Sequence, residues 1–200
     1  MAQQDPVQQL QEIRSMMERS SKFLSLSGWA GIMAGIYAIA GTWLAYRMYG
    51  FNPDELFYSN PNLREIIWLT VGILLLALLT AVLFSRKQAS KNGDDNWNAT
   101  SRRLLAAMSV PLVSGGAVTL LFISKGLIGL LAPSTLLFYG LALYNASFYT
   151  IQEVRVMGYL QMTLGLLGFW FIDLGLLFWA LGFGVIHIIY GVYMFFRYER

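Results

Sequence analysis

The chain has 200 residues, of which 56% are hydrophobic and only 12% are charged, and its mean hydropathy is +0.54. A soluble domain has about 25% charged residues, so this composition excludes an ordinary soluble domain and indicates an integral membrane protein. The absence of cysteine excludes disulfides and thiolate metal sites. Because the polar stretches are short, we expect residues 1–200 to form a single transmembrane domain.

The first 22 residues are polar and of mixed charge. Within and just after them, Leu10, Ile13, Met17 and Leu24 recur at helical spacing, with charged residues mostly off that stripe. This pattern predicts a short amphipathic helix over 1–22 that lies on the cytoplasmic membrane surface. A helix that docks on a partner protein is the alternative.

Six segments are apolar enough to cross a membrane, which takes about 20 mainly apolar residues. They are residues 23–46, 66–84, 104–123, 127–148, 156–172 and 176–196. The fifth segment is the shortest of the six. We therefore predict an all-α membrane protein of six transmembrane helices, arranged in antiparallel hairpins.

The basic residues predict the orientation, because Lys and Arg in short loops stay on the cytoplasmic side. With the N-terminus inside, eleven of the fourteen basic residues are cytoplasmic and three are outside. The three outside residues are Arg47, Arg64 and Lys125. The count favours both six crossings and cytoplasmic N- and C-termini.

Small residues form stripes at a spacing of three or four in the first, fifth and sixth segments, and such stripes let transmembrane helices approach closely. Gly31 and Gly35 form a GxxxG in the first segment. Folding the last two segments as a tight hairpin about Leu174 predicts a register between their stripes. The predicted pairs are Ala180 with Gly168, Gly184 with Gly165, Gly191 with Gly158, and His187 with Gln161.

His187 is the only ionisable residue that we place deep in the bilayer, where a polar group needs a partner or a water-filled cavity. We expect a polar site there that comprises His187 and Gln161, with Asn145 and Tyr144 as further members. In a structural interpretation, a neutral imidazole is hydrogen-bonded to Gln161 or to a nearby Ser or Tyr. In a functional interpretation, His187 carries protons or binds a substrate.

Two charged residues mark the predicted outer turns, Lys125 after the third segment and Asp173 before the sixth. They are a candidate ion pair at the outer rim, and two solvated turn charges are the alternative. The sequence has no HExxH motif and no second histidine for a metal pair. We therefore expect no catalytic residue, cofactor or metal, and an enzyme is disfavoured.

Three runs of sequence look like those of small, uncharacterised bacterial six-helix inner-membrane proteins. They are LSLSGWAG at 24–31, WNATSRRL at 97–104 and GFGVIHIIYG at 182–191. The resemblance implies a multi-pass protein of the bacterial inner (cytoplasmic) membrane. It implies no activity and transfers no functional residue.

Three functions remain open at this point. The first is a non-enzymatic scaffold, accessory or sensor subunit that binds the lipid bilayer and a second copy or another membrane protein, but no nucleic acid. The second is a small transporter or channel with its polar path around His187, and the third is an intramembrane enzyme that acts on lipid. If the protein is a scaffold, His187 should be buried and hydrogen-bonded to protein groups. If it is a transporter, a water-accessible path should reach His187. If it is an enzyme, a cavity should hold two convergent catalytic groups.

Overall fold

The computed structural model describes residues 27–92 and 99–199, and these residues are mostly helical with no strand among them. The predicted all-α class is therefore confirmed for the described part of the chain. The predicted amphipathic helix over 1–22 lies outside the described residues.

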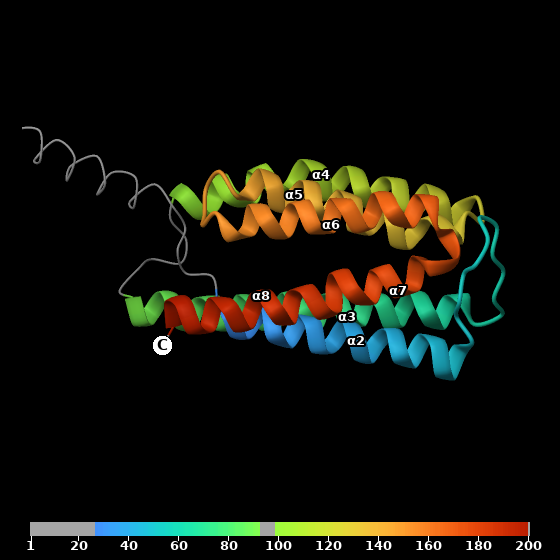
Figure 1. Ribbon diagram of the computed structural model, residues 1–200, viewed down its shortest axis with the longest axis horizontal. Helices are drawn as coiled ribbons and strands as arrows, with labels where there is room; N and C mark the ends of the chain where they lie inside the picture. The colour runs from blue at the N-terminus through green and yellow to red at the C-terminus, as the bar shows by residue number, and fades with distance from the viewer. Residues whose placement is uncertain (1–26, 93–98, 200) are drawn as a thin grey trace, which may run out of the picture.

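Six long helical segments run side by side (Figure 1). The first four segments of the bundle are α2, α3, α4 and α5, and a 3₁₀ turn, η1, precedes α5. The fifth is α6, and the sixth is a composite helix that we call the C-terminal helix. The bounds are α2 Gly28–Tyr49, α3 Leu63–Asn92, α4 Ala99–Ser124, η1 Ile128–Leu130, α5 Leu131–Ala146, α6 Glu153–Trp170, η2 Ile172–Leu174, α7 Gly175–Trp179, η3 Ala180–Ile186, α8 His187–Met194 and η4 Phe195–Glu199.

Five of these segments are long and apolar enough to span a membrane, and they match five of the six predicted segments. The exception is α6, which has 18 residues and carries Glu153, Arg155 and Gln161. Its Gln161 is completely buried, so α6 presents this polar residue to protein rather than to the surroundings. A helix that is partly enclosed by other helices needs less apolar surface than one that faces lipid on most sides.

The six segments form two groups of three (Figure 1). We call α4, α5 and α6 the central half, and α2, α3 and the C-terminal helix the terminal half. Within the central half, α5 packs on both α4 and α6. Within the terminal half, α2 packs on both α3 and the C-terminal helix.

Glycine brings α2 and the C-terminal helix into close contact in the terminal half. A Cβ atom on Gly35 would lie 2.6 Å from the backbone oxygen of Gly184, and one on Gly31 would lie 3.1 Å from Cα of Gly191. Real Cβ atoms essentially never approach closer than 3.0 Å. The GxxxG of the first segment therefore serves helix packing, as its spacing predicts.

Glycine plays the same part between α5 and α6 in the central half. A Cβ atom on Gly165 would lie 2.7 Å from the backbone nitrogen of Leu137, and one on Gly158 would lie 2.9 Å from that of Tyr144. These neighbours are backbone atoms, which cannot rotate away as a side chain can. Both halves are thus held by backbone-to-backbone approach at glycine.

The predicted register between the last two segments is wrong for its glycines. Gly158 and Gly165 face α5, whereas Gly184 and Gly191 face α2. The glycine stripes do mark close contacts, but the stripe of α6 meets α5 and the stripe of the C-terminal helix meets α2, so the two stripes do not meet each other. The physical reason is that a small-residue stripe allows close approach by any helix and does not identify its partner.

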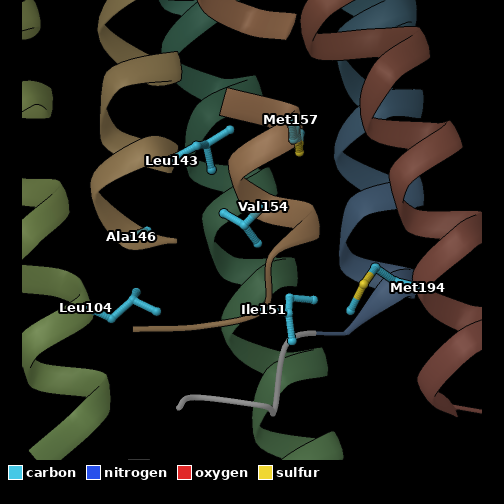
Figure 2. Close-up of a cluster of buried hydrophobic side chains, with 7 residues drawn as sticks. All are labelled: Leu104, Leu143, Ala146, Ile151, Val154, Met157 and Met194. Carbon is cyan, nitrogen blue, oxygen red and sulfur yellow. The ribbon is translucent and has the colours of Figure 1, made fainter. Parts of the chain in front are cut away.

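The two halves are joined at both ends of the bundle. At one end, the segment between α2 and α3 crosses to the central half, where the backbone N–H of Gly129 donates to Leu56 O over 3.3 Å (Figure 1). At the other end, a buried apolar cluster draws side chains from both halves (Figure 2). Its members are Leu104, Leu143, Ala146, Ile151, Val154, Met157 and Met194.

Candidate functional site

A buried polar network joins the two halves between these ends. The Nε2 atom of His187 lies 3.0 Å from the hydroxyl of Tyr139 in α5, and its Nδ1 atom lies 2.9 Å from Gly182 O. The amide of Gln161 in α6 donates to the same Gly182 oxygen over 2.7 Å. We call Tyr139, Gln161, Gly182 and His187 the His187 bridge, because two members come from each half.

The hydrogen bonds define the tautomer of His187. A carbonyl oxygen only accepts, so Nδ1 must carry the proton that it shares with Gly182 O. In the neutral ring Nε2 is then an acceptor, and the Tyr139 hydroxyl donates to it. Both ring nitrogens are satisfied by neutral groups of the protein, and His187 is only 7% exposed. This geometry suits a neutral imidazole in an apolar interior.

The Gly182 carbonyl lies in a stretch where the C-terminal helix is wound more loosely than an α-helix. Residues Ala180–Ile186 form a π-helix, in which backbone hydrogen bonds reach one residue further than in an α-helix. Gly182 also leaves room for its neighbours, since a Cβ atom there would lie 2.6 Å from Oε1 of Gln161. The π-helix and the glycine together let two side chains reach one backbone oxygen.

Aromatic rings surround the bridge. The rings of Tyr139 and His187 stack with centroids 5.5 Å apart, and Phe183 lies 5.1 Å from Tyr139 and 5.8 Å from His187. Trp179 continues the series at 5.0 Å from Phe183. These rings fix the plane of the imidazole and separate it from polar surroundings.

Three buried polar atoms near the interface of the halves have no hydrogen-bond partner in the described structure. They are Ser134 Oγ on α5, Gln161 Oε1 on α6 and Tyr190 Oη on α8. An unpaired polar group in an apolar interior costs about 1–3 kcal/mol. Within the His187 bridge, both ring nitrogens of His187 therefore have hydrogen-bond partners, whereas the side-chain oxygen of Gln161 has none.

The structure brings together two of the four predicted members of the polar site. His187 and Gln161 meet through Gly182 O, whereas Asn145 donates instead to Ala107 O of α4 over 3.3 Å. The ring of Tyr144 packs against Phe148 and Tyr159. Asn145 and Tyr144 thus belong to packing contacts within the central half.

The two residues of the candidate outer-rim pair each lie in a turn between two helical segments. Lys125 follows α4, and Asp173 lies in η2. They form no ion pair with each other within residues 99–199, and Asp173 instead lines a groove beside α2.

Sequence reasoning missed two members of the bridge. It anticipated a tyrosine near His187 without identifying Tyr139, and it gave no role to Gly182. Tyr139 has no distinguishing signal among the eleven tyrosines. Gly182 contributes a backbone carbonyl, and the sequence carries no mark of the π-helix in which it lies.

Two open grooves lie at the ends of the terminal half, and the bridge lines neither of them. The first, of about 440 Å³, lies between α2 and the start of the C-terminal helix. The second, of about 370 Å³, is lined by residues that include Trp29, Lys87 and Glu199. Across residues 27–92 and 99–199, no group of three or more His, Asp or Glu side chains could hold a metal ion.

No protein-family model, no curated protein and no solved structure matches this chain. The fold and the His187 bridge are therefore interpreted from their own geometry.

Proposed function

We propose that the protein is a non-enzymatic scaffold or accessory subunit of a membrane, and that the His187 bridge holds its two halves together. One observation carries this proposal. The single histidine is buried, and protein groups occupy both of its ring nitrogens. A substrate ligand needs a ring nitrogen open to its cargo, and a proton carrier needs a water-accessible path to the ring, whereas the bridge lines neither of the two grooves.

We infer six membrane crossings with both ends on the cytoplasmic side of a bacterial inner membrane. The antiparallel course of α6 beside α5 supports α6 as the fifth crossing (Figure 1), and the distribution of basic residues supports the orientation. Cysteine accessibility tests this. A single cysteine at Asp54 should react with a membrane-impermeant maleimide from outside intact cells, whereas one at Glu199 should not.

The lipid bilayer is the first partner of such a bundle. Only 11% of the α3 segment is buried, and α3 packs chiefly against α2. Most of its surface, including Leu75 and Leu79, remains for lipid, a second copy or another membrane protein. A scaffold that binds within the membrane needs such a surface.

Proteoliposome flux tests the scaffold against transport. We expect ion and proton flux at the level of empty liposomes for both the wild type and His187→Phe. Flux above that level in the wild type, lost in His187→Phe while the variant remains folded, would contradict the proposal.

A small transporter or channel is the second candidate. The unpaired Gln161 Oε1 and Tyr190 Oη favour it, because polar atoms along an interface of two halves can contact water or a solute when the halves separate. Spin labels at Val156 and Tyr193, two exposed positions in opposite halves, distinguish the candidates. If the protein is a scaffold, the distance between the two labels in lipid should have a single distribution. If it is a transporter, two distributions are expected, one for each arrangement of the halves.

A further inference from the structure

We propose that residues 50–62, which connect α2 to α3, form a strap that fixes the separation of the two halves at one end of the bundle. The strap belongs to the terminal half along the chain, and it reaches the central half at Gly129 in η1 (Figure 1). We call this end of the bundle the strap end. A strap of this kind acts in a scaffold and in a transporter alike, so its role does not depend on that of His187.

The strap is held in a defined shape at the end of α2. The hydroxyl of Tyr58 donates to Gly50 O over 2.9 Å. The side-chain amide of Asn60 donates to Tyr49 O over 3.0 Å, and its oxygen accepts the backbone N–H of Asn62 over 2.8 Å. These bonds satisfy carbonyls that a helix leaves free at its C-terminal end, and they connect the end of α2 with the start of α3. The strap therefore keeps one shape and can set a distance between the parts that it joins.

The far side of the strap rests on Gly129, which is buried. The backbone N–H of Gly129 donates to Leu56 O over 3.3 Å. A Cβ atom on Gly129 would press on Glu55 O, well inside the 3.0 Å limit of real Cβ contacts, and would lie 2.9 Å from Cγ2 of Ile172 in η2. Residue 129 is therefore enclosed between the strap and η2, and the strap comes this close only because residue 129 has no side chain.

The strap lies at the end where the two halves are already closest. There α7 packs on both α5 and α6, and η1 contacts η2. Towards α8 the C-terminal helix diverges from α6 (Figure 1), and the hydrogen bond between Tyr198 and Glu153 at that opposite end is exposed. The strap and η2 thus tie the halves at the strap end, and any separation of the halves has to begin at the opposite end.

Distances between pairs of spin labels in lipid test the strap, and the chain has no cysteine of its own to interfere with labelling. Labels at Met48 in α2 and Trp170 in α6 report on the strap end, and both positions are exposed. We expect a single narrow distance distribution for this pair. Gly129→Val should push the strap away from η1, so the distribution should shift to longer distances and become broader. The distribution for labels at Val156 and Tyr193, at the opposite end, should be unchanged.

A second variant releases the strap from α2 instead, and it decides the outcome if Gly129→Val does not fold. Tyr58→Phe combined with Asn60→Ala removes the side-chain bonds to the end of α2 and should have the same effect on the strap-end pair. The matched controls are Asn52→Ala, whose side chain takes no part in these bonds, and Gly116→Val, where a Cβ atom would meet nothing within 4 Å. Both controls should leave the distances as they are in the wild type.

Strap-end distances that stay unchanged in Gly129→Val and in the double variant would overturn the proposal. Equal broadening at both ends of the bundle, or the same change in Gly116→Val, would also overturn it, because the bundle would then have loosened in general.

Discussion

The central and terminal halves are built from the same kind of contact but in different chain order. In the central half, α4, α5 and α6 follow one another and pack as successive hairpins. In the terminal half, α2 packs against the last helix of the chain, with Gly28 next to Gly191. The comparison teaches that glycine sets how close two helices come, whereas the choice of partner depends on the whole bundle.

The halves also differ in how much of each helix is enclosed. The inner helix of the central half is α5, of whose segment 44% is buried, and the inner helix of the terminal half is α2, of which 28% is buried. The central half therefore encloses its inner helix more fully. Substitutions at the contacts of each half test this difference.

The largest effects should come from glycines at the helix contacts of each half. Gly35→Val in the terminal half and Gly165→Val in the central half place a side chain against backbone atoms. Each should lower the free energy of unfolding by about 3 kcal/mol, the upper end of the range for overpacking. Equilibrium unfolding in mixed micelles measures this.

The matched controls are Gly72→Val on α3 and Gly116→Val on α4, where a Cβ atom would meet nothing within 4 Å. They should change stability by less than about 1 kcal/mol. Equal losses in controls and contact variants would mean that glycine is needed for its conformation rather than for close approach.

Loss of the His187 bridge should have the next largest effect. His187→Phe keeps an aromatic ring beside Tyr139 but removes two hydrogen bonds, and in membrane proteins each is worth about 0.6 kcal/mol and up to about 1.7. We expect a loss of about 1–2 kcal/mol in unfolding experiments. In a double-mutant cycle, Tyr139→Phe should add less in the His187→Phe background than alone. Strict additivity would show that the two side chains do not share a bond.

A methyl group at Gly182 should weaken the bridge by a smaller amount. Gly182→Ala places a Cβ atom against the side-chain ends of Leu136 and Gln161. These ends can shift, so we expect a loss of about 1 kcal/mol. Gly175→Ala, whose Cβ would lie 3.7 Å from that of Ala132, is the control and should be tolerated. The same loss in both would contradict a specific role for Gly182.

The smallest effect is expected at the end of the bundle. The Tyr198 hydroxyl donates to Glu153 Oε1 over 2.8 Å and links the two halves there, but this contact is exposed. Tyr198→Phe should therefore cost less than about 1 kcal/mol. Tyr193→Phe, another exposed tyrosine on the C-terminal helix, is the control for loss of a hydroxyl. If Tyr198→Phe lowered the free energy of unfolding more than His187→Phe does, the main link between the two halves would lie at the end of the bundle.

The sequence predicted the helices far better than their partners. Hydropathy locates a helix because lipid or protein must cover its apolar residues, and each predicted segment overlaps a helix of the described structure. Some helices run past these segments, as α3 does to Asn92, because backbone hydrogen bonding continues beyond the apolar stretch.

The sequence predicted only those members of the candidate site whose polar side chains had to pair with one another or with a shared acceptor. His187 and Gln161 are polar residues in apolar segments, so each had to find a partner, and they share one. Asn145 had an alternative acceptor in α4, Ala107 O. Gly182 acts through a backbone oxygen, and which side chains reach that oxygen depends on how the finished helices pack.

Nitrogen NMR of the protein in lipid bilayers tests the His187 bridge most directly. The chain has a single histidine, so its two ring nitrogen signals are unambiguous. We predict a neutral ring with the proton on Nδ1, and a Nε2 signal that shifts in Tyr139→Phe because its hydrogen-bond donor is lost. A proton on Nε2, a charged ring, or a Nε2 signal that Tyr139→Phe leaves unchanged would contradict the bridge between the two halves.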